Sequence, residues 1–334
     1  MLNKKNNKLL VITGPTGTGK TKLAVKLASV FNGEIVSADS RQVYKGMDIG
    51  TGKDLGDYII ELKVKSQKSK SRLQVNDKRL KVIPYHCIDI VLPNTEFNLA
   101  KYVKLANFAI KDIQKRGKLP ILAGGTGLYF QALADGYNLS ETKPDKALRE
   151  KLEKKSILQL QKIFYELSAR NESVSGGDTN FKQDIKNKRY LIRYIEILKN
   201  SKKPLSKVLK KQGSGYDCLI LSIQLPREVI NKKIDKRLLY RIEKEKMIEE
   251  VKNLHFKNKI SWKRLESFGL EYKFVSQYLQ GKLEYKDMTE KLAIAIHQFA
   301  KRQMSWLRRW KRQGREIYWV QSYGEAKKLA QKWL

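Results

Sequence analysis

Short apolar runs alternate with amphipathic segments along the first 135 residues of the chain. Residues 8–13 form a β-branched apolar run that ends at Gly14, which is typical of a buried strand in a parallel sheet. Residues 20–31 have apolar positions at helical spacing and predict a helix, and residues 34–37 predict a second strand. Strand, helix and strand in this order indicate a βαβ unit.

The alternation continues beyond that unit. The pattern predicts a strand near 87–91, a helix near 97–116, a strand at 119–123 and a helix from Thr126. Strands that alternate with helices form parallel sheets, because right-handed crossovers place the helices on both faces. We therefore expect an α/β fold built on a doubly wound parallel sheet.

Two stretches depart from this alternation. Residues 54–83 are rich in Lys and Ser with alternating apolar positions, and predict a surface hairpin. Residues from about 144 to 211 form charged helical segments without a strand pattern, and predict a helical insertion. The expected organisation is a first part of the core at 1–140, a helical insertion at 141–212, and a second part of the core with basic C-terminal helices at 213–334.

The second part of the core returns with an apolar strand at 216–225. A long charged helix is expected at 227–254, another at about 284–312, and a last strand at 316–320. Residues 301–312 carry six basic residues with Trp306 and Trp310 between them. Because such runs are ordinarily solvated helix faces, we assign the tryptophans to core packing and only some of the charges to phosphate contacts.

The charge balance is strongly basic. The chain of 334 residues has 69 Lys and Arg against 34 Asp and Glu, which gives a net charge of +35 and a pI near 10.0. Residues 1–150 contribute +12 and residues 151–334 contribute +23. This excess indicates a polyanionic partner such as nucleic acid.

The N-terminus and the cysteines exclude several classes of protein. The apolar run near the N-terminus is too short for a signal peptide or a membrane span. Cys87 and Cys218 are the two cysteines, too few for a disulfide framework or a four-cysteine zinc site. We expect a cytoplasmic protein that does not enter the membrane, and a monomer without an obligate protein partner.

Residues 14–21 read Gly-Pro-Thr-Gly-Thr-Gly-Lys-Thr and fit the eight-position phosphate loop between a strand and a helix. Glycines let successive backbone N–H groups converge on phosphate oxygens at a helix N-terminus. Lys20 adds a point charge, and the Thr21 hydroxyl can bind Mg²⁺. The fold is therefore expected to be P-loop NTPase-like, with a diphosphate or triphosphate ligand.

The phosphate loop alone leaves the reaction open. A nucleotide kinase or NTPase needs a second acidic site for Mg²⁺, and Asp89 at the end of the third predicted strand could supply it. Asp39 follows the second strand, at the sheet edge where open α/β folds bind ligands. Taken alone, Asp39 is as readily a helix cap or turn residue as a catalyst.

Three segments together change that balance. Residues 37–53 contain Asp-Ser-Arg-Gln-Val-Tyr, residues 124–129 read Gly-Gly-Thr-Gly-Leu-Tyr, and residues 300–309 read Ala-Lys-Arg-Gln-Met-Ser-Trp-Leu-Arg-Arg. In this order, and over nearly the whole chain, they resemble the bacterial tRNA dimethylallyltransferase (tRNA isopentenyltransferase) family. The resemblance implies transfer of a dimethylallyl group from dimethylallyl diphosphate to N6 of the adenosine 3′ of the anticodon, in tRNAs that read codons beginning with U.

The resemblance also implies roles for individual residues. Asp39 would be the general base, with Thr16 and Arg237 at the leaving diphosphate and Thr21 at Mg²⁺. The diphosphate would lie on Gly14, Pro15, Thr16, Gly17, Thr18, Gly19, Lys20 and Thr21. Contacts to the anticodon stem-loop of tRNA would come from Asp39, Ser40, Arg41, Gln42, Thr126, Arg149, Arg189, Tyr190, Leu191, Ile192 and Arg193.

The same residues make chemical sense without the family. Allylic transfer needs a cradle for the departing diphosphate and a base for a weakly nucleophilic amine. An adenine stacked in an RNA loop must be flipped out to reach that cradle, and backbone contacts must recover the cost. The alternatives are prenyl transfer to free AMP or ATP, a P-loop nucleotide kinase, and non-enzymatic RNA binding, which would leave the cradle without a purpose.

The chain departs from the family at two places. About thirty residues follow Lys53 where relatives pass quickly to the equivalent of residues 84–86, and residues 269–272 read Gly-Leu-Glu-Tyr where many members have Gly-Tyr-Arg. These departures put ligand contacts after Lys53 and a tRNA contact near Glu271 in doubt.

Overall fold

The structure, a computed structural model, describes residues 7–62, 79–137, 145–170, 185–200, 205, 213 and 215–334. The chain divides into two compact units. Unit 1 comprises residues 1–134 and 215–334, and unit 2 comprises residues 135–214. The predicted insertion at 141–212 falls within unit 2. Among the described residues, no helix combines the length and apolar character needed to cross a membrane.

Unit 1 is built on a six-stranded sheet of order β5-β2-β6-β1-β7-β8 in which every pairing is parallel. Its strands are β1 (Lys8–Thr13), β2 (Gly33–Ala38), β5 (Tyr85–His86), β6 (Leu119–Gly124), β7 (Asp217–Ile223) and β8 (Tyr318–Val320). The predicted α/β fold with a doubly wound parallel sheet is confirmed.

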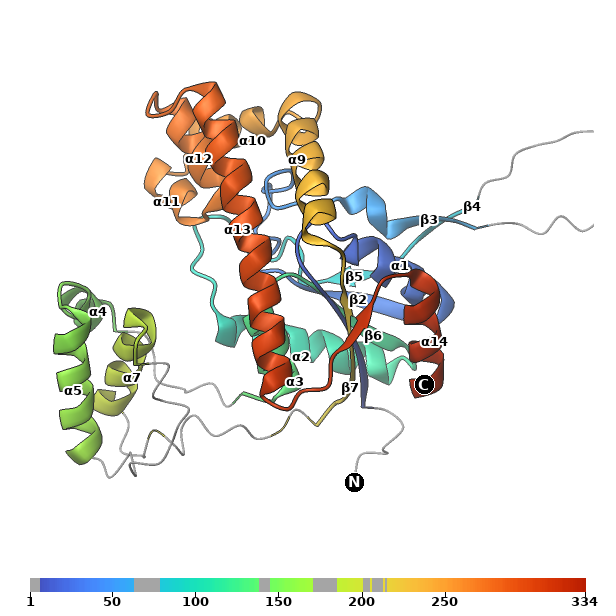
Figure 1. Cartoon of the computed structure of the whole chain (residues 1–334), viewed down its shortest axis with the longest axis horizontal. Coiled ribbons are helices and arrows are strands. Elements are labelled where there is room, and N and C mark those ends of the chain that lie inside the picture. Colours follow the sequence, from blue (N-terminus) through green and yellow to red (C-terminus); the bar gives the residue numbers. More distant parts are fainter. Residues whose placement is uncertain are drawn as a thin grey trace, which may run out of the picture. The chain divides into compact units, whose positions relative to one another are not determined.

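Helices cover both faces of this sheet (Figure 1). They are α1 (Lys20–Val30) and α14 (Tyr323–Trp333) on one face, and α2 (Leu99–Lys115), α3 (Gly127–Ala134) and the C-terminal end of α13 (Tyr285–Arg312) on the other. Central β1 is entirely apolar at Leu9, Leu10, Val11 and Ile12, and all four side chains are fully buried. Burial on both faces explains why this strand reads as a continuous apolar run instead of an alternating one.

A second helical layer packs at the carboxyl edge of the sheet. It consists of α9 (Arg227–Glu243), α10 (Met247–Phe256), α11 (Trp262–Ser267), α12 (Leu270–Leu279) and the N-terminal part of α13. Its apolar core includes Val43 and Met47 from the loop after β2. The loops that follow the central strands are therefore enclosed between the sheet and this layer.

The single long helix predicted at 227–254 is wrong, because it is two helices. Between α9 and α10, Lys246 adopts a left-handed backbone with φ 62°. The chain turns there while Ile242 and Met247 both stay in the same apolar core. The hydrophobic pattern therefore continues from α9 into α10. No glycine or proline in the sequence indicates that the helix ends between them.

The strand predicted near 87–91 is also wrong. The observed strand is β5, two residues earlier, and Cys87 and Asp89 have positive φ values of 64° and 54°. Left-handed residues cannot continue an extended strand. The apolar pattern arises because Ile88 and Cys87 are buried against opposite faces of the sheet.

The excursion predicted at 54–83 contains a 3₁₀ turn (Leu55–Tyr58) followed by β3 (Ile59–Leu62) and β4 (Arg79–Val82). These two strands pair antiparallel, with Ile60 opposite Lys81. Residues 63–78 between them lie outside the described residues.

Unit 2 contains α4 (Lys146–Glu153), α5 (Ile157–Arg170) and α7 (Lys188–Asn200). Its core is formed by apolar side chains from all three helices, including Leu152, Phe164, Leu191 and Ile195. Amphipathic helices of this length are stabilised mainly by such packing. The unit therefore has a hydrophobic core of its own.

Candidate active site

The phosphate loop, which connects β1 to α1, is stabilised by hydrogen bonds between its own residues. Gly17 and Gly19 have φ values of 82° and 84°, a left-handed conformation that glycine adopts without a Cβ penalty. Lys20 Nζ and Thr18 Oγ1 each donate a hydrogen bond of 2.8 Å to the Pro15 carbonyl. The sequence motif thus folds as a compact turn that opens helix α1.

A cavity of about 650 Å³ lies over this loop, and we call it the phosphate-loop cavity. Its lining combines Thr16, Lys20 and Thr21 with Asp39 and Arg237. The pKa of Lys20 is lowered to about 7, because burial disfavours the ammonium and Arg237 repels it, while Asp39 acts in the opposite direction. An anionic ligand in this cavity would restore the charge on Lys20.

Arg237 reaches the cavity from α9. Its Nη2 donates a hydrogen bond of 2.7 Å to the Thr16 hydroxyl. Burial and the neighbouring Arg241 lower the pKa of Arg237 to about 10. The guanidinium therefore remains protonated at neutral pH and contributes a fixed positive charge beside the loop.

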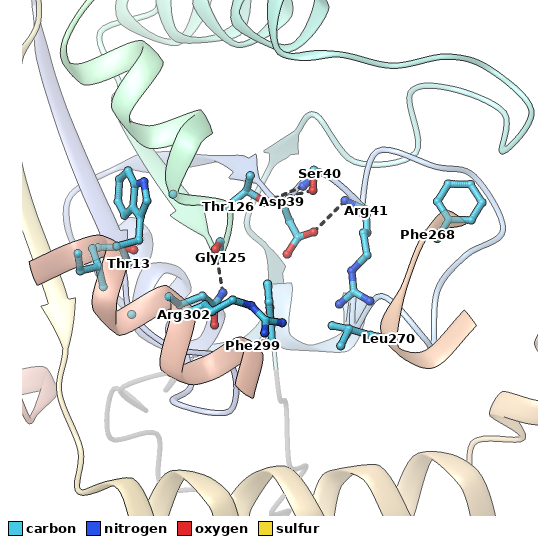
Figure 2. A pocket seen from close by; sticks show the side chains of 15 residues that line it. Thr13, Asp39, Ser40, Arg41, Gly125, Thr126, Phe268, Leu270, Phe299 and Arg302 are labelled. Atoms are coloured by element: carbon cyan, nitrogen blue, oxygen red, sulfur yellow. Dashed lines mark hydrogen bonds between the residues drawn. The ribbon is translucent and has the colours of Figure 1, made fainter. Parts of the chain in front are cut away.

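Asp39 stands at the carboxyl end of β2, where its Oδ1 accepts a hydrogen bond of 2.9 Å from the Arg41 amide. The Thr126 hydroxyl accepts one of 3.0 Å from the Ser40 amide, so the loops after β2 and β6 are tied together. Figure 2 shows Asp39 between the Gly125 loop and Arg41. β2 and β6 are adjacent in the sheet, which explains why residues far apart in the sequence meet here.

A second cavity of about 360 Å³ is also lined by Asp39, and we call it the aromatic cavity. Its apolar wall includes Phe299 and Trp306 of α13. Figure 2 shows Phe268, Leu270 and Phe299 around this cavity. Asp39 lines both cavities. Asp39 thus borders both a cavity with basic lining residues and a cavity with an aromatic lining.

Arg41 is fixed by a carboxylate from α12. Its Nη1 lies 2.6 Å from Glu271 Oε2, and Glu271 is only 4% exposed. Burial opposes the charged form of Arg41, but Glu271 and Asp39 hold its pKa above the usual value. Glu271, in the segment Gly-Leu-Glu-Tyr at residues 269–272, is thus the ion-pair partner of Arg41.

The structure brings one group of predicted site residues together. The phosphate-loop residues 16–21, Asp39, Arg41, Gln42 and Arg237 all line the phosphate-loop cavity, and Gly14, Ser40 and Thr126 line the aromatic cavity. Gln42 is engaged locally, since its carboxamide accepts from Ser37 Oγ and donates to the Gly52 carbonyl. Pro15 is buried beneath the loop and lines neither cavity.

The remaining predicted contacts lie in unit 2. Arg149 Nε and Nη2 donate to Glu196 at 2.9 and 2.8 Å, and Arg193 also bonds this carboxylate. Glu196 is fully buried, which opposes ionisation, but the hydrogen bonds from Arg149 and the Asp145 amide lower its pKa. Both arginines are therefore held in place by one buried carboxylate.

One part of the predicted RNA contact needs correction. The side chains of Leu191 and Ile192 are buried in the core of unit 2, whereas Arg189 and Tyr190 are exposed. On a helix, neighbouring positions face different directions. The side chains of Leu191 and Ile192 thus support the helix that presents Arg189 and Tyr190.

Asp89 does not serve as a second acidic site beside the phosphate loop. It forms an ion pair with Lys53, whose buried ammonium also bonds Asp48 Oδ1 at 2.6 Å and the Tyr44 carbonyl at 2.7 Å. Asp89 lines neither cavity. The prediction that Asp89 could supply the second acidic site of a nucleotide kinase is therefore wrong.

The structure adds residues to the site to which the sequence analysis assigns no role. They are Arg241, Phe268, Leu270, Phe299, Arg302 and Gln303. The basic run at 301–312 was the one signal that could have indicated them. The predicted solvated face is observed for Lys301 and Arg308, whereas Gln303 in the same run is buried.

Comparison with known proteins decides the family. The family description "IPP transferase" matches residues 73–310, and "Isopentenyl transferase" matches residues 7–64. A tRNA dimethylallyltransferase 2 of Treponema denticola is 42% identical, with 96% of this chain and 97% of the relative covered. The chain belongs to the tRNA dimethylallyltransferase family. The predicted class of enzyme, a prenyltransferase, is thereby confirmed.

Other members of the tRNA dimethylallyltransferase family support this assignment. A tRNA dimethylallyltransferase 1 of Syntrophus aciditrophicus is 40% identical, with 94% of this chain and 93% of the relative covered. The crystal structure of the full-length tRNA isopentenylpyrophosphate transferase from Bacillus halodurans is similar with a TM-score of 0.61 and 29% identity, covering 98% of this chain and 94% of that one. A eukaryotic dimethylallyltransferase crystallised acting on tRNA has a TM-score of 0.67 and 27% identity, over 90% of this chain and 70% of that one.

Proposed function

We propose that this chain transfers the dimethylallyl group of dimethylallyl diphosphate to N6 of the adenosine immediately 3′ of the anticodon, in tRNAs that read codons beginning with U. The observation that carries the proposal is the position of Asp39, which lines both the phosphate-loop cavity and the aromatic cavity. A base between an anion site and an apolar acceptor site fits transfer of an allyl group from a diphosphate to an amine.

The diphosphate would occupy the phosphate-loop cavity. Lys20 and Arg237 supply positive charge, and the loop presents backbone N–H groups at the start of α1. Charge develops on the diphosphate oxygen as the C1–O bond breaks, and fixed positive groups stabilise that charge. Thr16 is placed by Arg237 through the hydrogen bond between their side chains.

The Thr21 hydroxyl is the proposed contact for Mg²⁺. It lines the phosphate-loop cavity beside Lys20. Among the described residues, no three Asp, Glu, His or Cys side chains gather to hold a metal by themselves. This fits a Mg²⁺ ion held largely by substrate phosphate oxygens, as Mg²⁺ prefers. When bound, the ion would neutralise charge on the diphosphate.

Asp39 is the proposed general base. As C1 of the dimethylallyl group bonds to N6, the C1–O bond to diphosphate breaks, and one proton leaves N6 for the Asp39 carboxylate. The Arg41 amide bonds Oδ1 of Asp39, which leaves the other oxygen, Oδ2, to accept the proton. A base of this kind contributes roughly 10² to 10⁴ to the rate.

The aromatic cavity would receive the flipped adenine and exclude water from the allylic carbon. Phe299 and Trp306 offer faces on which a base can stack, which is worth about 1–3 kcal/mol per base. Extrusion of a nucleotide costs a few kcal/mol. Stacking inside the cavity and phosphate contacts outside it together offset this cost.

The tRNA would be bound by the basic surface of the chain. Exposed Lys301, Arg308 and Lys311 lie on α13, the helix that also supplies Phe299 to the cavity. In unit 2, Arg189 and Tyr190 are exposed on α7, as expected for contacts to the stem-loop. A monomer is sufficient for this proposal, because both cavities are formed within unit 1 of one chain.

One experiment separates the proposed acceptor from its alternative. The chain is incubated with Mg²⁺ and dimethylallyl diphosphate labelled in the allyl group, with an anticodon stem-loop RNA or AMP as acceptor. Label in the RNA at the adenosine 3′ of the anticodon supports the proposal. Label in AMP, with none in the RNA, would replace the tRNA acceptor by a free nucleotide.

A further inference from the structure

Gln303 lies where the phosphate-loop cavity and the aromatic cavity adjoin. It belongs to α13, is 8% exposed, and lines both the phosphate-loop cavity and the aromatic cavity. An uncharged polar side chain buried at such a place must satisfy its hydrogen-bonding groups within the protein. The hydrogen-bond partners of Gln303 therefore show which parts of the site its side chain connects.

Both ends of the Gln303 carboxamide are bonded to backbone atoms of the site. Oε1 accepts a hydrogen bond of 2.8 Å from the Thr16 amide, and Nε2 donates one of 2.8 Å to the Gly125 carbonyl. One side chain thus joins the phosphate loop after β1 to the loop after β6 (Figure 2 shows the bond at Gly125). Among the residues that the structure describes, Gln303 is the one whose side chain bonds the backbone of both loops.

The absence of a side chain at Gly125 permits the close approach of Gln303. A Cβ built on Gly125 would lie 2.6 Å from Gln303 Nε2 and 3.7 Å from Asp39 Oδ2. The first distance is too short for any side chain at this position to leave the carboxamide undisturbed, and the second places the Gly125 backbone beside the proposed base. Hydrogen bonds therefore join Thr16, Gln303 and Gly125, and Gly125 lies near the carboxylate of Asp39.

We propose that Gln303 is a positioning residue for group transfer, which fixes the distance between the diphosphate cradle at Thr16 and the acceptor side of the pocket at Gly125 and Asp39. The inference rests on the proposed function. Transfer requires C1 of the allyl group and N6 of adenine to stay within reacting distance. In the proposed complex the phosphate loop holds the diphosphate that carries C1, and the loop after β6 borders the cavity that receives the adenine. A side chain that bonds both loops sets that distance through the two loops.

The expected signature is a loss of turnover without a matching loss of binding. In Gln303→Met, which keeps the length of the side chain and removes both hydrogen bonds, kcat falls roughly 10- to 100-fold, as for other small displacements of reacting groups. The dissociation constants of inorganic pyrophosphate and of the anticodon stem-loop stay close to those of the unaltered chain. In Gln303→Glu, which keeps the acceptor for Thr16 and loses the donor to Gly125, the fall in kcat is still present.

Gly125→Ala tests the same contact from its other side. The added methyl group displaces Nε2 of an intact Gln303, so kcat falls as in Gln303→Met. Gln313→Met is the matched control, because Gln313 follows the same helix and its Oε1 accepts from Gln131 Nε2 at 3.1 Å, away from both cavities. Its kcat is expected to be that of the unaltered chain, and thermal unfolding verifies that all variants are folded.

Two results would overturn the inference while the proposed function stands: an unaltered kcat in Gln303→Met, or a fall in kcat matched by equal weakening of pyrophosphate or RNA binding. If the unaltered chain transfers no dimethylallyl group to the stem-loop, the proposed function fails, and the role of Gln303 in transfer fails with it.

Discussion

The guanidinium of Arg237 donates a hydrogen bond of 2.7 Å to the hydroxyl of Thr16, although 221 residues separate them in the sequence. The Thr16 amide is bonded in turn by Gln303. Thr16 is therefore held from α9 and α13 at once. The second helical layer, and not the phosphate loop alone, determines where this loop presents its ligands.

Replacement of Arg237 tests its role at the leaving group. Arg237→Met removes a fixed positive charge from the phosphate-loop cavity, so kcat for transfer is expected to fall roughly 10² to 10³-fold, as for loss of one preorganised charge-stabilising group. Steady-state transfer to stem-loop RNA at saturating substrate concentrations measures kcat. Lys236→Met removes an exposed neighbouring charge and should leave kcat unchanged. Equal effects of the two variants would contradict a specific role for Arg237.

Replacement of Asp39 tests the proposed base. Asp39→Asn keeps the size of the side chain and an oxygen that can accept from the Arg41 amide, but cannot take the N6 proton. The single-turnover rate should fall roughly 10² to 10⁴-fold, while the RNA dissociation constant is retained. Asp112→Asn, which alters an exposed carboxylate paired with Arg116, is the control. Near-normal turnover of Asp39→Asn would exclude Asp39 as the base.

The sequence predicted the part of the site that local signals specify. A phosphate loop is a contiguous motif between a strand and a helix. Asp39 follows directly after β2, and Thr126 lies two residues after the end of β6. Because the carboxyl ends of adjacent parallel strands share one edge of a sheet, their proximity follows from the topology. These residues are the ones that the structure places around the two cavities.

The residues that were missed depend on packing between distant segments. Gln303 bonds Gly125 across 178 residues of sequence, and its approach depends on where α13 crosses the sheet. The break at Lys246 and the left-handed residues Cys87 and Asp89 carry no glycine signal either. In these places tertiary contacts, which a pattern along the chain does not contain, decide the local conformation.

The lowered pKa of Lys20 predicts a pH dependence of diphosphate binding. In the free chain this pKa is about 7, because burial and Arg237 disfavour the ammonium. A bound diphosphate favours the charged form and raises the pKa, so binding takes up a proton above pH 7. Affinity for inorganic pyrophosphate should therefore weaken as pH rises above 7, by up to about tenfold per pH unit from this group.

Calorimetric titration in buffers of different ionisation enthalpy measures this proton uptake. Lys20→Arg provides the control, because a guanidinium stays charged throughout the range while pyrophosphate itself titrates identically. The difference between the two chains isolates Lys20. Identical proton uptake in both would contradict the assignment.

The buried pair of Arg41 and Glu271 predicts a large loss of stability when one partner is removed. Glu271→Ala leaves the guanidinium of Arg41 buried without its carboxylate, which is expected to lower the free energy of unfolding by about 3–5 kcal/mol. All five tryptophans lie in unit 1, so their fluorescence during urea unfolding reports on this unit. Asp287→Ala breaks an exposed pair with Lys291 and should change the stability little. Similar effects of both variants would mean that the Arg41 pair is solvated.

The basic face of α13 predicts a specific salt dependence of RNA binding. Each phosphate contact releases counterions, so its loss makes the plot of log affinity against log salt shallower by about one unit or less. The double variant Arg308→Ala, Lys311→Ala should therefore reduce the slope by roughly one to two units, as measured by filter binding to the stem-loop over a salt series. The double variant Lys104→Ala, Lys111→Ala removes the same charge from exposed positions on α2. A smaller slope for the α13 variant alone would assign phosphate contacts to α13. An equal reduction of the slope in both double variants would mean that overall charge, and not contact by α13, accounts for RNA binding.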